Sequence, residues 1–238
     1  MIWYYLCDKL GLIVWQDFVN GGESYKFLTI AAPLFTGIHH KDTNYKKFSR
    51  MNKEGREKTL QEFKDTINYL YNVPSIGLWT IFNEGWGQFD SVPIYNELSK
   101  LDPTRLYDHA SGWHDQGVSD TKSYHVYFKQ FKIKNNAKTK QRAIILSEFG
   151  GFVLPIQGHM MKGNHVYKSF KTPEAWLDKY KGTIQKDVIN NIPKGLSAII
   201  YTQLSDVEEE LNGFVTFDRE IVKVDPKLIK EINDEIKY

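Results

Sequence analysis

Two glutamates in this sequence stand where a catalytic carboxylate would be expected. Residues 76–82 form an almost unbroken apolar run, and Glu84 follows this run two positions later. Residues 143–146 form a second apolar run, and Glu148 follows it at the same distance, shortly before two glycines. Such runs are typical of strands buried on both faces of a parallel sheet. Each glutamate is therefore predicted at the end of a buried strand, either as a solvated cap or as a carboxylate that does chemistry.

Together the two glutamates suit the cleavage of a glycosidic bond. That reaction uses two carboxyl groups that flank the anomeric carbon. The candidates are 148 − 84 = 64 residues apart, so each ends a different strand. In a barrel of parallel strands, both side chains would project into one mouth. Asn83 and Trp86 crowd the first glutamate in the way that a sugar-binding cleft requires.

Further side chains could complete such a site. Trp86 and Trp113 are candidate aromatic walls, because flat rings stack on the apolar faces of sugars. Aromatic residues make up 14% of the chain, and core packing must account for most of them. His125 and Tyr127 share one face of a predicted strand, because strand side chains alternate. Asp17 ends a short apolar strand, and it either contacts sugar hydroxyls or caps a loop.

Composition narrows the class of protein. The chain has 238 residues, of which 41% are hydrophobic and 25% are charged, the balance of a globular protein with a substantial core. The net charge of +2 gives no sign of a nucleic-acid or membrane partner. The single cysteine, Cys7, can form neither an intrachain disulfide nor a metal cluster, and no nucleotide motif is present, so no cofactor is expected. Residues 1–15 are apolar but interrupted by charges, which fits neither a signal peptide nor a transmembrane helix.

Helices and strands are predicted to alternate, which favours a parallel α/β fold. Helices are expected over residues 3–10, 53–71, 92–101 and from 173 onward, with Ser91 and Thr172 as N-caps. Strands are expected near residues 12, 76, 106, 123, 144 and 196, with polar residues at their C-terminal ends, as in a (β/α)8 TIM barrel. Because six strands cannot close such a barrel, residues 1–238 are interpreted as one incomplete barrel domain with two open strand edges.

The connecting segments carry less information. Residues 24–52 are predicted to be a long loop with a short helical piece, residues 152–170 a long loop, and the basic segment 129–142 a solvated connection. The acidic run from Asp206 to Glu210 is interpreted as a solvated turn, with Asp206 the one member that could belong to the site.

Three stretches resemble glycoside hydrolase family 2, which contains β-galactosidases and β-glucuronidases. Residues 83–86, NEGW, resemble the acid/base motif at the end of the family's fourth barrel strand. Residues 144–151, IILSEFGG, resemble its nucleophile strand, and residues 201–219, YTQLSDVEEELNGFVTFDR, resemble its eighth strand and the segment after it. The likeness covers residues 4–219. It implies that the six strands correspond to strands three to eight, and that the first two strands and the upstream domains of a parent enzyme are missing.

The resemblance also implies roles. Family 2 enzymes retain the anomeric configuration, so Glu148 would be the nucleophile and Glu84 the acid/base, with their carboxyl groups roughly 5–5.5 Å apart. Asn83 would hydrogen-bond the sugar 2-hydroxyl in the transition state, and Tyr127 would hydrogen-bond and orient Glu148. The family's usual strand-eight Trp is replaced by the stretch from Tyr201 to Gln203.

The sequence thus predicts a retaining β-glycoside hydrolase, with β-galactosides or related β-glycosides as substrates. Glucuronides and mannosides stay open, as do the compartment and a homo-oligomeric state. Two alternatives remain: a catalytically silent sugar-binding fragment, and a cellulase-like barrel glycosidase of the same clan. The acidic stretch 205–219 favours family 2 over the latter.

Overall fold

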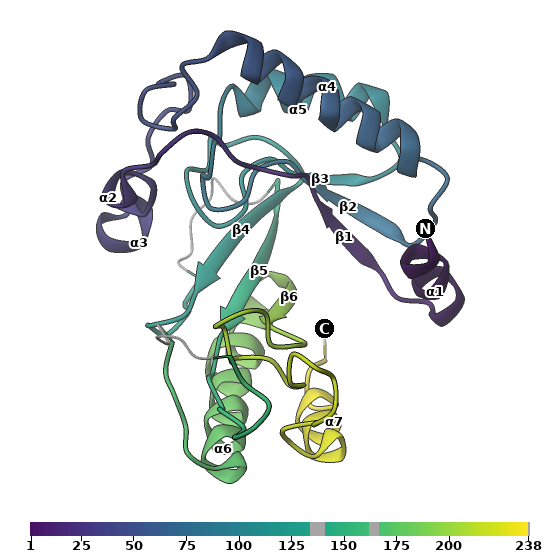
Figure 1. Ribbon diagram of the computed structural model, residues 1–238, viewed down its shortest axis with the longest axis vertical. Helices are drawn as coiled ribbons and strands as arrows, with labels where there is room; N and C mark the ends of the chain where they lie inside the picture. The colour runs from purple at the N-terminus through teal and green to yellow at the C-terminus, as the bar shows by residue number, and fades with distance from the viewer. Residues whose placement is uncertain (134–140, 162–166, 238) are drawn as a thin grey trace. The chain divides into compact units, whose positions relative to one another are not determined.

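The structure is a computed structural model that describes residues 1–133, 141–161 and 167–237 (Figure 1). The chain divides into two compact units, Met1–Tyr124 and His125–Tyr238, and each is described by itself. Part of the predicted basic connection, residues 134–140, lies outside the described residues. No helix in the described ranges combines the length and the apolar character needed to cross a membrane.

The first unit packs two long helices on a parallel sheet. Its elements are α1 (Ile2–Leu10), β1 (Val14–Asp17), α2 (Phe27–Ile30), α3 (Ala32–Thr36), α4 (Lys53–Leu70), β2 (Ile76–Thr80), α5 (Ser91–Leu101) and β3 (Leu106–Asp108). The strands are parallel and lie in the order β1-β2-β3. Helices α4 and α5 lie side by side over this sheet (Figure 1). Phe63 and Ile67 of α4 pack with Trp79 of β2 in the core, as the apolar spacing along α4 predicts.

One predicted helix cap in this unit is wrong. Ser91 is the first residue of α5, and Asp90 precedes it as N-cap without a side-chain capping bond. The N–H of Ser91 donates instead to Oδ2 of buried Asp42 at 3.0 Å, and the Ser91 hydroxyl donates to the same oxygen. A carboxylate 49 residues away in the sequence therefore satisfies the first turn of α5.

The second unit holds a further sheet. Strand β4 (Thr121–Val126) runs across the boundary between the units and is followed by β5 (Ala143–Gly150), α6 (Pro173–Thr183), β6 (Leu196–Thr202) and α7 (Pro226–Asn233). A π-helical turn, Ile184–Val188, and a 3-10 helix, Ile189–Lys194, continue α6. The strand order is β4-β5-β6, and β5 pairs with β6 in parallel.

The helix predicted after residue 173 is confirmed. Thr172 caps α6, because its hydroxyl accepts a hydrogen bond from the N–H of Ala175 at 3.3 Å. The predicted apolar face is buried: Trp176 stacks on Tyr180 with ring centroids 5.3 Å apart, and Ile184 extends this face into the π-helical turn. Helix α7 was not predicted.

All six predicted strands are present, and the parallel α/β architecture is confirmed. In the described part of the chain they form two three-stranded sheets rather than a closed barrel. Their assignment to strands three to eight of a barrel stays a prediction, as does the single domain over residues 1–238. Strand β6 is last in its sheet and leaves Ile200 39% exposed, as expected for an open edge.

Candidate active site

The backbone at Glu84 departs from the strand that precedes it. Asn83 still forms a parallel bridge with Ser111, and the N–H of Glu84 donates to the Ser111 carbonyl at 3.0 Å. Glu84 itself has φ +51°, and Gly85 has φ +72°. A left-handed conformation is costly for a glutamate and is found where the surroundings impose it, often at functional sites. Two successive left-handed residues thus turn the chain at the end of this strand.

A buried imidazole packs beneath this turn. A Cβ atom added to Gly85 would lie 2.6 Å from Cδ2 of His114, so only glycine fits there. The backbone N–H of His40 donates to Nδ1 of His114 at 3.0 Å, so the ring proton is on Nε2, which donates to the Ile30 carbonyl at 2.7 Å. Burial lowers the pKa of His114 to about 4. The His114 imidazole that packs against this turn is therefore uncharged at neutral pH.

The side chains predicted to surround Glu84 have different environments. The N–H of Asn83 donates to Oδ1 of Asn20 at 2.5 Å, and the buried Asn83 Oδ1 has no hydrogen-bond partner among the residues that the structure describes. Trp86 is half-buried and meets Tyr25 edge-on, with ring centroids 5.1 Å apart. Trp113 is only 8% exposed and belongs to a core cluster, so packing accounts for its ring. Their sugar-binding roles stay predictions.

Asp17 lies on the strand next to that of Glu84. It ends β1, is exposed, and stands opposite Thr80 of β2 in the parallel register. Asp17 and Glu84 are therefore two candidate carboxylates that lie at or just after the ends of neighbouring parallel strands. The predicted contact of Asp17 with sugar hydroxyls stays a prediction.

The second unit presents Glu148 at an irregularity in β5. Leu146 stands opposite Ile199, but Phe149 stands opposite Tyr201, so three steps along β5 match two along β6. Such a bulge redirects side chains and is common next to active sites. Glu148 is half-buried inside this bulge.

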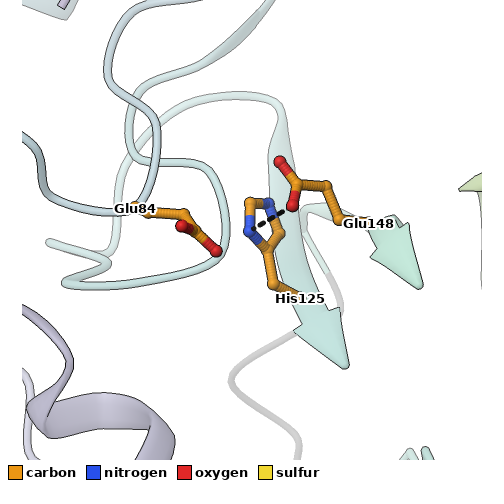
Figure 2. Close-up of side chains that lie close together, drawn as sticks. All are labelled: Glu84, His125 and Glu148. Atoms are coloured by element: carbon orange, nitrogen blue, oxygen red, sulfur yellow. Dashed lines mark ion pairs between the residues drawn. The ribbon is translucent and has the colours of Figure 1, made fainter. Parts of the chain in front are cut away.

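Two side chains from the end of β4 converge on one oxygen of Glu148. The hydroxyl of Tyr127 donates to Oε2, and Nδ1 of buried His125 lies 3.3 Å from the same atom. Figure 2 shows the His125 ring directed at this carboxylate. Burial, and then the negative charge of Glu148, raise the pKa of Tyr127, so the phenol keeps its proton and stays a donor. The strand alternation that placed His125 and Tyr127 on one face thus leads both to Glu148.

Glycines allow aromatic rings to approach the backbone closely just after Glu148. Gly150 has φ +90°, and a Cβ atom there would lie 2.1 Å from the ring of Tyr201. Gly151 has φ +63°, and its Cβ atom would lie 3.1 Å from the ring of Tyr127. The predicted glycine-rich loop is therefore required for packing as well as for the turn.

Sequence reasoning missed one contact of the site and one structural pair. The hydroxyl of Thr202, at the end of β6, lies 3.2 Å from the Tyr127 hydroxyl. The sequence marked this position only as a departure from the family. Asp206, considered as a site residue, is instead buried with Lys223, whose Nζ lies 2.7 Å from Oδ1. The N–H of Gly213 also donates to Asp206, which therefore organises the loop after β6.

Comparisons with known proteins point to one family. The family described as glycosyl hydrolases family 2, TIM barrel domain, matches residues 1–237. A search of curated proteins gave no match. Among solved structures, a family 2 β-galacturonidase from Eisenbergiella tayi, bound to galacturonate, is 18% identical, with a TM-score of 0.66. The match covers 99% of this chain and 43% of that one.

Two further structures are β-glucuronidases. The enzyme from Dictyoglomus thermophilum is 16% identical, with a TM-score of 0.62, over 97% of this chain and 42% of that chain. The enzyme from Parabacteroides merdae is 14% identical, with a TM-score of 0.56, over 91% and 28%. At such identities the likeness shows the fold alone. The matches cover 43%, 42% and 28% of these three structures, so the chain spans less than half the length of each.

Proposed function

Since this chain belongs to glycosyl hydrolase family 2, we propose that it carries the catalytic residues of a retaining β-glycoside hydrolase. Glu148 is the nucleophile and Glu84 is the acid/base. The observation that carries the proposal is the convergence of the Tyr127 hydroxyl and the His125 imidazole on one oxygen of Glu148. Two polar contacts on one oxygen hold a carboxylate in a single orientation.

The reaction then proceeds in two displacements. In the first, the Glu148 carboxylate attacks the anomeric carbon, a C–O bond to the enzyme forms, and the glycosidic C–O bond breaks. Glu84 gives its proton to the leaving oxygen in the same step. In the second, Glu84 takes a proton from water, which attacks the anomeric carbon and releases Glu148. Tyr127 stays protonated and serves as a positioning donor.

Asn83 suits a contact with the sugar. Its side-chain oxygen is buried and meets no hydrogen-bond donor within the described ranges, and such an atom costs free energy unless a ligand satisfies it. A hydroxyl at C2 of the sugar would donate to it. This contact would strengthen as charge develops in the transition state and would thus favour catalysis over binding.

The proposal requires that the two glutamates face each other across one bound sugar. The carboxyl groups of Glu84 and Glu148 should lie about 5–6 Å apart, the distance of a retaining enzyme. A crystal structure with a bound inhibitor measures this distance. A separation above about 10 Å would exclude direct attack with proton donation on the same bond.

The substrate is the second part of the proposal. We propose a β-glycoside, with β-galactosides as the first candidate. Because the structural relatives are named as a β-galacturonidase and β-glucuronidases, aryl β-glucuronides and β-galacturonides belong in the same panel.

The test is covalent labelling by a 2-deoxy-2-fluoro glycoside with a good leaving group. The fluorine slows the second displacement, so the glycosyl-enzyme accumulates and intact mass spectrometry detects it. We expect the label on the peptide containing Glu148, its loss in Glu148→Gln, and its persistence in the control Glu174→Gln, which changes an exposed residue on α6. Labelling of another residue would show that the nucleophile is misassigned.

The acid/base role has its own signature. Glu84→Gln should slow substrates with poor leaving groups most, because an activated aryl group needs little protonation. Added azide should restore the second step by replacing activated water. Equal losses on all substrates without rescue would refute the role. A folded chain that binds sugars but neither labels nor turns over would instead favour the silent sugar-binding alternative.

A further inference from the structure

We propose that His159, Asp218 and Glu220 bind one divalent transition-metal ion, for which Zn²⁺ is the natural probe. These residues take no part in the proposed hydrolysis, and the inference does not depend on it. His159 belongs to the loop after β5, and the two carboxylates belong to the loop after β6. One ligand atom from each lies within 4.8 Å of the other two.

The spacing fits a shared ion. Nδ1 of His159 lies 2.7 Å from Oδ2 of Asp218 and 3.8 Å from Oε2 of Glu220. Ligands bound to zinc at about 2.1 Å in a tetrahedron lie roughly 3.4 Å from one another. The two observed distances bracket this value. The Glu220 side chain is 70% exposed and can therefore adjust its position at little cost.

The Asp218 carboxylate is already held in place. Its Oδ1 atom accepts hydrogen bonds from the Thr216 hydroxyl at 2.6 Å and from the Glu220 N–H at 3.1 Å. These two donors hold the Asp218 carboxylate in one orientation. On the other loop, the N–H of His159 donates to the Ile156 carbonyl at 3.1 Å. Supporting hydrogen bonds of this kind orient metal ligands.

The charge of the cluster also favours a cation. In the described ranges, the ion pairs of Asp218 and Glu220 are formed with His159, and none involves a lysine or arginine. The neighbouring guanidinium of Arg219 donates instead to the Ser205 hydroxyl and the Phe217 carbonyl. Two carboxylates and an imidazole thus give a negative site with one nitrogen donor. This set suits zinc better than magnesium or calcium, which take oxygen ligands.

A bound ion would tie the loop after β5 to the loop after β6. Binding to the folded chain alone would raise its stability by mass action. A water molecule would fill the remaining coordination position.

The experiment titrates zinc chloride into the chelator-treated 238-residue chain by isothermal titration calorimetry. We expect a single ion per chain and a higher melting temperature with zinc. His159→Ala and Glu220→Gln should each weaken binding at least about tenfold, the lower end of what losing even an outer-shell partner costs. His39→Ala, which removes an exposed imidazole of the first unit, should leave binding unchanged.

Absence of zinc binding, or an equal loss in His39→Ala, would overturn the proposal. Equal affinity for magnesium would refute the nitrogen-containing site. Circular dichroism checks that each variant is folded. If His159→Ala does not fold, Glu220→Gln decides, because its exposed side chain can change without disturbing the core.

Discussion

Replacing Tyr127 with Phe removes one hydroxyl from the site and leaves the ring. The hydroxyl donates to Oε2 of Glu148, and hydrogen bonds to charged groups contribute about 1.5–3 kcal/mol. At about 1.4 kcal/mol per tenfold, loss of this bond should lower kcat/KM for an aryl glycoside by about 10- to 150-fold. His125, 3.3 Å from the same oxygen, should limit the loss to this range.

The assay compares Tyr127→Phe with Thr202→Val and Tyr69→Phe. Thr202 touches the Tyr127 hydroxyl and not the carboxylate, so its loss should cost only about 2- to 10-fold, the effect of a neutral hydrogen bond. Tyr69 is 71% exposed and should have no effect. Urea unfolding of each variant separates catalysis from stability. A Tyr127→Phe variant with less than about a threefold loss would refute the idea that this hydroxyl positions the nucleophile.

Three further substitutions test the fold that supports the site. Gly150→Ala should lower the free energy of urea unfolding by about 1–3 kcal/mol more than Gly158→Ala, because both have positive φ but only the first meets an aromatic ring; equal losses would contradict this. Lys223→Met should cost about 3–5 kcal/mol by leaving a buried carboxylate unpaired, whereas Lys230→Met, in an exposed pair, should cost little; a small loss in the first would show that water reaches the pair. Burial lowers the pKa of His114 to about 4, so the unfolded chain binds a proton there first, and stability should fall as the pH drops from about 6.5 to 4. His114→Gln should flatten this dependence in urea unfolding at several pH values, and an unchanged slope would assign it to other groups.

Secondary structure was predictable where local chemistry decides it. The spacing of Leu60, Phe63 and Ile67 predicts the buried face of α4, and Phe63 and Ile67 are in the core. Thr172 caps α6 because its own hydroxyl can reach the first turn. The cap predicted at Ser91 failed because the acceptor there is supplied by a distant loop, which no local pattern reveals.

Helix α7 was missed although its start carries a local signal. The Asp225 side chain accepts from the N–H of Lys227 at 2.9 Å, and Pro226 occupies the first turn. Both are ordinary start signals for a helix. The burial of Asp206 with Lys223 was not predictable, since the two are 17 residues apart and pair only through the loop's tertiary path.

Within the candidate site, the most informative sequence pattern was the alternation of side chains along a strand. Alternation placed His125 and Tyr127 on one face, and both reach Glu148 in the structure. Alternation says nothing about which strands become neighbours, so the contact of Tyr127 with Thr202 was out of reach. The distance between Glu84 and Glu148 also depends on which strands become neighbours, so it stays a prediction.

Both candidate glutamates lie where regular strand geometry stops. Glu84 has a left-handed backbone, and Glu148 lies in a bulge. In an unbroken buried strand, every side chain points into one of two apolar layers, where an ionised carboxylate would be strongly destabilised. A break in the strand lets the carboxylate leave these layers while the apolar residues before it stay in the core. A glycine follows each glutamate within two positions because the turned backbone must pass close to a ring, that of buried His114 at Gly85 and that of half-buried Tyr201 at Gly150.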